Sequence, residues 1–138
     1  MAVDRAFGYQ PGMSNTFPIT IFHNPACGTS RNTVALVQAA GYEPTVVEYL
    51  KTGWTRPQLE GLFAAMGSKP REVLREMGSP AEELGLLKPT ATDDQILDAM
   101  VAHPILVNRP IVVTPLGTRL TRPKELVLPL LETQPPAA

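Results

Sequence analysis

Cys27 is the only cysteine in this chain of 138 residues, and its surroundings favour a reactive thiol. Asn24-Pro25 ends a predicted strand just before it, and Gly28 follows it at the start of a predicted helix. A cysteine at a helix start faces unpaired backbone N–H groups, which favour its thiolate. Because an ordinary thiol has a pKa of about 8.5, such help is needed at neutral pH. Cys27 is the candidate nucleophile, and a buried structural cysteine is the alternative.

Several polar residues stand close enough in sequence to assist this thiol. His23 lies four residues before Cys27 and Arg31 four residues after it, so either side chain can add positive charge. Thr29 and Ser30 add hydroxyl groups. The alternatives are that His23 is a hydrogen-bonded structural residue and that Arg31 caps the turn or is solvated.

The same helix start is suited to a tetrahedral anion. Backbone N–H groups at a helix N-terminus bind phosphate-like groups, so we expect residues 28–30 (Gly28, Thr29 and Ser30) to line the substrate site. The chain carries eight arginines against four lysines, and guanidinium groups bind oxyanions as planar forks. Arg109 precedes a predicted strand, Arg122 follows a predicted hairpin, and Arg75 lies on a middle helix. Each arginine has the alternative of being an ordinary surface charge.

The cysteine count and the composition exclude several classes of protein. One cysteine permits neither an internal disulfide nor a Cys-x-x-Cys pair, and we expect a reducing, cytoplasmic setting without a secretory signal. A net charge of −1 predicts no nucleic-acid partner, and no apolar run approaches the ~20 residues that span a bilayer. His23, His103 and Cys27 lack metal-ligand spacing, so we expect neither a metal nor a bound cofactor.

The elements that must position these residues begin with a βαβ unit. Residues 19–23 are β-branched and aromatic and predict a buried strand. Residues 27–40 predict a helix that ends at Gly41, and residues 45–49 predict a second strand. The connection through a helix predicts that the two strands are parallel.

The middle of the chain predicts three helices. Thr55 with Gln58 and Thr92 with Gln95 are capping boxes, and Ser79-Pro80 with Glu82 indicates a further start. The apolar residues expected on the buried faces of the first and last of these helices are Leu59, Leu62, Phe63 and Met66, and then Ile96, Leu97, Met100 and Val101.

The C-terminal third predicts a hairpin over residues 111–121 and then a final helix that begins near Pro123. Pro129 is expected to kink or shorten that helix. The whole order predicts an α/β fold, a thioredoxin-like βαβ…ββα mixed sheet with a helical insert between its two halves. We expect a flexible arm over residues 1–18, one domain over 19–131 and a disordered tail over 132–138.

Two segments resemble the glutaredoxin-coupled arsenate reductases. They are residues 19–33 (ITIFHNPACGTSRNT) and residues 103–120 (HPILVNRPIVVTPLGTRL), and the resemblance extends over residues 19–131. It implies a thioredoxin-like fold, in which a cis proline, here Pro110, precedes the third strand. It also implies reduction of arsenate to arsenite, with glutathione as co-substrate and a glutaredoxin as partner.

The resemblance also implies roles for individual residues. Cys27 matches the nucleophile that forms a thiol–arsenate adduct, and His23 matches the residue associated with thiol activation. Arg75, Arg109 and Arg122 match the arginines that hold arsenate and its reduced product.

The single sulfur bears on the mechanism, because the second thiol needed for reduction must then come from outside the chain, which fits glutathione. A phosphatase-related, thioredoxin-coupled reductase would need several cysteines and a Cys-x5-Arg loop, and Thr33 stands where that arginine would be. Two alternatives remain. One is a general glutathione-dependent thiol oxidoreductase, and the other is an Spx-like regulator that binds RNA polymerase, although Ser30 replaces the second cysteine of the Spx switch.

Overall fold

The computed structural model describes residues 17–132, so most of the expected arm and tail lies outside the described residues. Phe17, which the sequence analysis places in the arm, is instead buried, at 6% exposure. Its ring lies 5.4 Å from that of Tyr42, centroid to centroid. Burial of an aromatic ring removes a large apolar area from water, which ties this position to the core.

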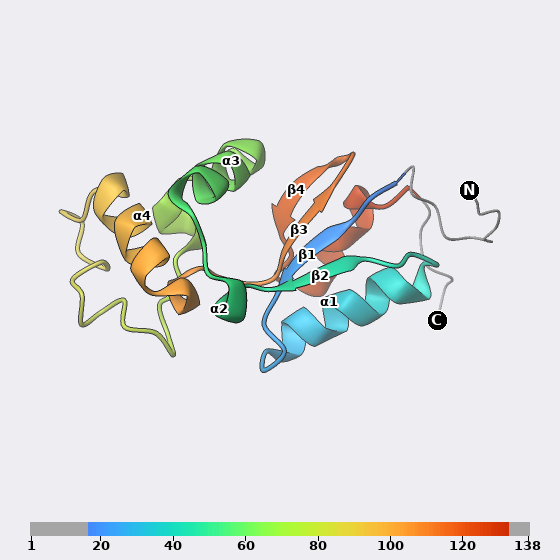
Figure 1. Ribbon diagram of the computed structural model, residues 1–138, viewed down its shortest axis with the longest axis horizontal. Coiled ribbons are helices and arrows are strands. Elements are labelled where there is room, and N and C mark those ends of the chain that lie inside the picture. Colours follow the sequence, from blue (N-terminus) through green and yellow to red (C-terminus); the bar gives the residue numbers. More distant parts are fainter. Residues whose placement is uncertain (1–16, 133–138) are drawn as a thin grey trace. The chain divides into compact units, whose positions relative to one another are not determined.

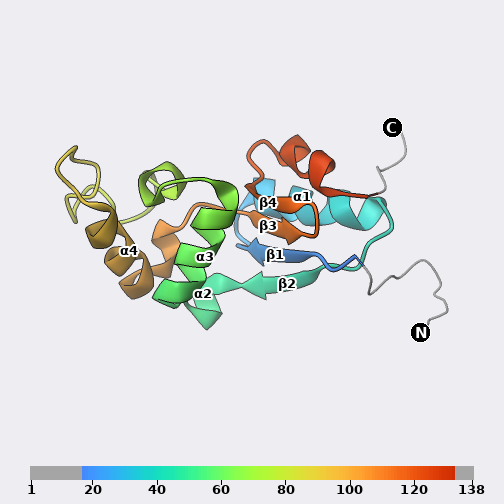
Figure 2. The same ribbon diagram turned by 90° about the horizontal axis from the view of Figure 1, so that it is seen from above.

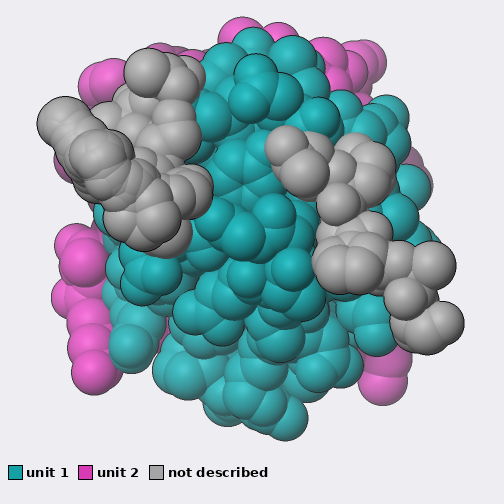
Figure 3. Space-filling model, turned by 90° about the vertical axis from the view of Figure 1, so that its right-hand side faces the viewer, with its two compact units in different colours: residues 1–48, 109–138 teal, residues 49–108 magenta. Residues whose placement is uncertain are grey.

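The chain divides into two compact units (Figure 3). One comprises residues 1–48 and 109–138, and the other comprises residues 49–108. The second unit coincides with the helical insert that the sequence predicts between the two halves of the fold.

A four-stranded mixed sheet forms the centre of the first unit (Figures 1 and 2). Its strands, in the order β2-β1-β3-β4, are β2 (Thr45–Glu48), β1 (Thr20–His23), β3 (Ile111–Thr114) and β4 (Gly117–Leu120). As predicted, β1 and β2 are parallel and β3 and β4 form an antiparallel hairpin. β3 also pairs antiparallel with β1, which joins the two halves into one sheet. The predicted thioredoxin-like arrangement is confirmed.

One face of this sheet is covered by α1 (Gly28–Ala39) and by the 3-10 helix η3 (Lys124–Leu130). Ile19 and Ile21 are two residues apart and therefore point to the same face, and Val112 of β3 lies opposite Ile21. All three pack in one cluster with Val37 of α1 and Val127 of η3. This apolar layer holds α1, and hence Cys27, against the sheet.

The predicted final helix is a 3-10 helix and continues through Pro129, where a kink or an early end was expected. Proline has no N–H to donate to the carbonyl four residues earlier, and its ring clashes with that carbonyl, so an α-helix cannot continue. Its bonds instead span three residues, as in Leu126 N–H to the Pro123 carbonyl and Leu131 N–H to the Leu128 carbonyl.

The second unit contains the predicted capping boxes. Its elements are α2 (Tyr49–Thr52), α3 (Arg56–Met66), η1 (Pro70–Val73), α4 (Asp93–Ala102) and η2 (Pro104–Leu106). Thr55 and Gln58 cap α3 reciprocally, and Thr92 and Gln95 do the same for α4. Arg56 pairs with Glu60 of its own helix and with two acidic residues of α4, Asp94 and Asp98, so it links α3 to α4.

Three expectations for this unit are wrong. Arg75, expected on a middle helix, lies outside any helix, two residues after η1 ends at Val73. Ser79-Pro80 begins a series of turns and not a helix. Leu84 N–H donates to the Pro80 carbonyl, as in a helix, but Leu86 N–H donates to the Ala81 carbonyl five residues earlier, and this bond closes the turn. Val101, expected on the buried face of α4, is 37% exposed, whereas the other three apolar residues are buried. In the described part of the chain, 17–132, no helix has the length and apolar character needed to cross a membrane.

Candidate active site

The strand pairing brings three of the predicted site segments to one end of the sheet. The loop with Cys27 follows the end of β1, and the antiparallel partner β3 begins at that same end, with Ile111 opposite Phe22. β4 runs back to this end, where Leu120 lies opposite Ile111. Arg109, just before β3, and Arg122, just after β4, are therefore neighbours of Cys27 in space.

A tight turn carries the chain from β1 into α1. The Asn24 side-chain oxygen accepts from Ala26 N–H at 2.9 Å, and the Asn24 carbonyl accepts from Cys27 N–H at 3.0 Å. Arg31 reaches back from α1 and donates to the Pro25 carbonyl at 2.8 Å. The turn places Cys27 at the N-cap of α1, in extended conformation. Arg31 therefore braces the turn, which is the capping alternative considered above.

The Cys27 thiol has a pKa below its ordinary value. Burial is the largest single influence and acts to raise the pKa, because only 7% of the residue is exposed. It is outweighed by a hydrogen bond from Ser30 N–H, by the Arg122 guanidinium, whose Nη1 lies 3.5 Å from Sγ, and by the charge and hydrogen bond of Arg109. Helix start and guanidinium groups together favour the thiolate.

Arg122 is fixed by a second contact. Its Nη1 also donates to the Arg109 carbonyl at 3.0 Å, so the two predicted arginines are linked directly. Thr121, immediately before it, donates its N–H to the Pro110 carbonyl at 3.0 Å. The Arg109–Pro110 peptide bond is cis, as the resemblance implied, and the Arg122–Pro123 bond is also cis.

His23 bonds to Ser30. The His23 Nδ1 lies 2.6 Å from Ser30 Oγ, and this oxygen also accepts from Asn24 N–H at 3.1 Å. Burial lowers the pKa of His23, the nearby Glu48 carboxylate raises it, and Arg31 lowers it, with a net lowering. The ring is therefore neutral at pH 7, and Nδ1 and Ser30 Oγ share one hydrogen bond whose donor is set by which ring nitrogen carries the proton. His23 acts on the start of α1, through Ser30.

Ser30 contributes its backbone to the sulfur and its side chain to the fold. The side chain is fully buried, and its hydroxyl bonds to His23 and Asn24, whereas its N–H faces Cys27. Asn24, which the sequence analysis used only as the end of a strand, is a main organiser of the loop. An Asn-Pro pair directly after a strand is typical of a side-chain turn and could have indicated this role.

The other expected residues lie as follows. Gly28 is exposed, and a side chain there would contact only Arg31, at 3.7 Å. The Thr29 carbonyl accepts from the Thr33 hydroxyl at 2.9 Å. Arg75 belongs to the second unit, where its N–H donates to the Leu106 carbonyl at 2.8 Å, and its role stays a prediction.

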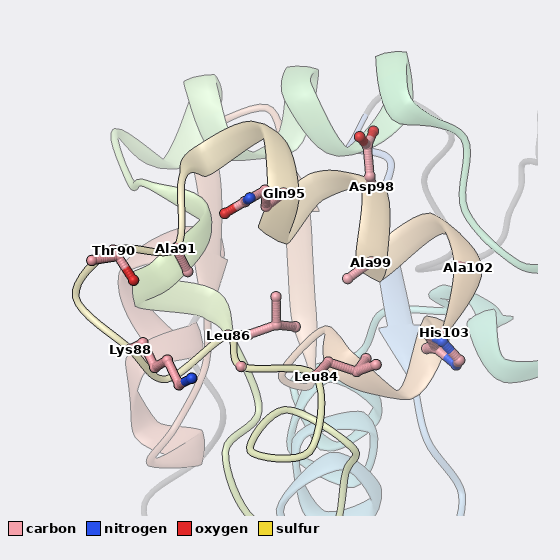
Figure 4. Close-up of a pocket in the computed structure, with 11 residues that line it drawn as sticks. Leu84, Leu86, Lys88, Thr90, Ala91, Gln95, Asp98, Ala99, Ala102 and His103 are labelled. Atoms are coloured by element: carbon pink, nitrogen blue, oxygen red, sulfur yellow. The ribbon is translucent and has the colours of Figure 1, made fainter.

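The second unit also contains a cavity of about 790 Å³, seen in Figure 4. It lies between the turns at 84–91 and α4 with the residue after it, and its lining includes Leu84, Leu86, Gln95, Asp98 and His103. None of the predicted site residues lines it. Across residues 17–132, no group of three or more His, Cys, Asp or Glu side chains is placed to hold a metal ion.

The arrangement around Cys27 therefore combines a nucleophile with a cradle for negative charge. A thiolate repels an oxyanion, but donors at the helix start and two guanidinium groups neutralise both partners. Such a site can bring a tetrahedral oxyanion within reach of the sulfur.

Comparison with known proteins agrees with this geometry. The model of the ArsC family matches residues 22–130. An arsenate reductase of Synechocystis sp. is 64% identical over 117 residues, which cover 85% of this chain and 84% of the relative. An arsenate reductase of Escherichia coli is 57% identical over 119 residues, 86% of this chain and 82% of the relative. The structure of an arsenate reductase from Vibrio cholerae superposes with a TM-score of 0.79 at 37% identity, covering 83% of this chain and 98% of that one.

Proposed function

This chain belongs to the ArsC family and is an arsenate reductase, which is an oxidoreductase. From this we propose that it reduces arsenate to arsenite at Cys27, with glutathione and a glutaredoxin as electron donors. The proposal places the chemistry on one sulfur and draws the other thiols from solution. Its setting is the reducing cytoplasm, where free glutathione is available.

The observation that carries the proposal is the placement of a solitary thiol at the N-cap of α1, with the Arg122 guanidinium 3.5 Å from its sulfur. Cys27 is the only cysteine in the chain, and Ser30 N–H, Arg109 and Arg122 together favour its thiolate. The same guanidinium groups suit an arsenate dianion, because a planar fork of donors matches two oxyanion oxygens. Nucleophile and anion cradle thus share one end of the sheet.

In the first step, the Cys27 thiolate attacks arsenic and an arsenate oxygen leaves as water after taking up protons, which forms an S–As(V) bond. In the second step, a glutathione thiolate attacks the Cys27 sulfur. The S–As bonding pair moves to arsenic, which is reduced from the pentavalent to the trivalent state and leaves as arsenite. The two sulfurs are oxidised to a Cys27–glutathione mixed disulfide.

In the last step, a glutaredoxin thiolate attacks the glutathione sulfur of that disulfide, and Cys27 leaves as a thiolate. A low pKa makes Cys27 a better leaving group here, just as it supplies the nucleophile in the first step. Arg109 and Arg122 hold the substrate and neutralise the charge that gathers on it, and Arg75 is assigned the same role from the resemblance. His23 and Ser30 hold the start of α1 in place.

The test is arsenate-dependent NADPH oxidation in the presence of glutathione, glutathione reductase and a glutaredoxin. We expect turnover with the native chain and none with Cys27→Ser. If glutaredoxin is left out, mass spectrometry should detect glutathione on Cys27 after arsenate is added. Turnover that needs no glutathione, or that survives the loss of Cys27, would refute the proposal.

The general thiol oxidoreductase is separated by its substrate preference. Arg109→Gln should lower kcat/KM for arsenate strongly and that for a small neutral disulfide little, because only the oxyanion needs the guanidinium. If the disulfide is turned over well and arsenate is not, arsenate is not the substrate of this site. The Spx-like alternative is disfavoured, because the curated relatives at 57–64% identity are named arsenate reductases.

A further inference from the structure

The side chain of Arg75 turns back on its own segment. Its Nε–H donates to the Met77 carbonyl at 2.9 Å, and its backbone N–H donates to the Leu106 carbonyl at 2.8 Å. The Ser79 hydroxyl donates to the Arg75 carbonyl and accepts from Ala81 N–H at 3.2 Å. The guanidinium is thus bonded within its own turn, whereas the backbone of Arg75 is held both by Ser79 of this turn and by Leu106.

Gly78 is the residue over which this guanidinium lies. Its φ is +71°, in the left-handed region that side chains rarely adopt. A Cβ at this position would lie 2.7 Å from Arg75 Nη2 and 3.4 Å from Cζ, so the guanidinium would have to move. The backbone angle favours glycine at this position, and a Cβ there would displace the end of the Arg75 side chain from the place it occupies in this turn.

We propose that Gly78 is a positioning residue for Arg75 in arsenate binding. This inference rests on the role that the proposed function gives to Arg75. A free arginine side chain loses rotamer freedom when it binds a ligand, and a guanidinium already fixed by folding avoids that cost. Gly78 permits the fixed geometry, because it leaves the space that the guanidinium occupies.

The test compares two glycine substitutions that impose the same backbone strain. Gly85 lies in the same unit with φ +74°, and a Cβ there would come no closer than 4.0 Å to its nearest neighbour, the end of Lys88. Gly85→Ala is therefore the matched control for Gly78→Ala. We expect Gly78→Ala to raise KM for arsenate by up to about tenfold, the loss of one pre-ordered side chain, with kcat little changed. Gly85→Ala should leave KM unchanged.

A double-mutant cycle with Arg75→Ala assigns the effect to the guanidinium. In the Arg75→Ala background, Gly78→Ala should have no further effect on KM, because the group it displaces is gone. The inference is overturned if Gly78→Ala and Gly85→Ala raise KM equally, or if the effect of Gly78→Ala persists without Arg75. If Arg75→Ala alone leaves KM unchanged, the role of Arg75 in the proposed function is wrong instead, while Cys27 chemistry stands.

A second variant covers the case in which Gly78→Ala does not fold. Gly78→Asn also adds a Cβ beside Arg75, but asparagine tolerates the left-handed region better than alanine does. We expect its circular dichroism spectrum to show a folded protein and its KM for arsenate to rise as in Gly78→Ala. A folded Gly78→Asn variant with native KM contradicts the proposal.

Discussion

Arg122 offers the sharpest test of how the fold controls the thiol. Its Nη1 is 3.5 Å from the Cys27 sulfur and 3.0 Å from the Arg109 carbonyl. Arg122→Gln removes the positive charge and keeps an amide donor on a side chain of similar polarity. The pKa of Cys27 should therefore rise, because the thiolate loses a neighbouring cation while burial of the thiol continues to oppose ionisation.

The size of the rise follows from the distance and from exposure. Two unit charges about 4 Å apart interact by about 1 kcal/mol in water and by about 4 kcal/mol at an effective dielectric constant of about 20. Arg122 is exposed, so the value lies toward the aqueous end, at about 1–2 kcal/mol. Because one pKa unit corresponds to about 1.36 kcal/mol, we expect the pKa of Cys27 to rise by about one unit.

The assay is the ultraviolet absorbance of the thiolate as a function of pH, with the rate of alkylation by iodoacetamide as a second readout. Arg119→Gln is the matched control, because Arg119 is an exposed arginine of β4 whose Nη1 donates to the Leu126 carbonyl at 3.4 Å. It should leave the pKa of Cys27 unchanged. If Arg122→Gln also leaves it unchanged, the guanidinium does not stabilise the thiolate and the account of the site is refuted.

Two further predictions concern the network behind the sulfur. Ser30→Ala should lower the free energy of unfolding, measured in urea, by about 1–3 kcal/mol, because this substitution leaves His23 Nδ1 and Asn24 N–H buried without their partner. Asn32→Ala, at an exposed position of the same helix, is the control. An unchanged urea midpoint for Ser30→Ala would contradict the buried network. The lowered pKa of His23 means that, as the pH falls below about 6.5, the unfolded chain binds a proton that the folded chain does not. Titration of His23 therefore leaves stability unchanged well above that pH and lowers it as the pH falls below it. His23→Asn should therefore lose less stability than the native chain between about pH 7 and about pH 5, and equal losses would show that the histidine is not held neutral.

The sequence by itself was sufficient for features that depend on near neighbours in the chain. Strand, turn and helix over residues 19–40 follow from β-branched and aromatic residues, from Asn-Pro and from helix-start signals, and they place Cys27 at the start of α1. The capping boxes at Thr55 and Thr92 were identified from residues three positions apart. Such patterns act over one helical turn, so they can be recognised without knowing how the rest of the chain folds.

The same local reasoning was wrong where a short signal lacked support. Ser79-Pro80 with Glu82 has the residues of a helix start, but the chain closes into a turn after Leu84. Pro129 was expected to interrupt an α-helix, and the structure avoids the conflict with a 3-10 helix. Burial of Val127 and Leu130 against the sheet holds that segment in place, and this packing is invisible to a local pattern.

Only the tertiary structure decided which groups meet the sulfur. Arg122 is 95 residues from Cys27 in the chain, and it reaches the sulfur because β3 pairs antiparallel with both β1 and β4 and so returns the chain to the end of the sheet where α1 begins. Ser30 likewise makes two separate contacts, its N–H with the Cys27 sulfur and its hydroxyl with His23, and both depend on how α1 packs. Contacts of this kind arise from strand pairing and from burial of the whole core. The free energy of both depends on residues from several segments, so it cannot be read from any one of them.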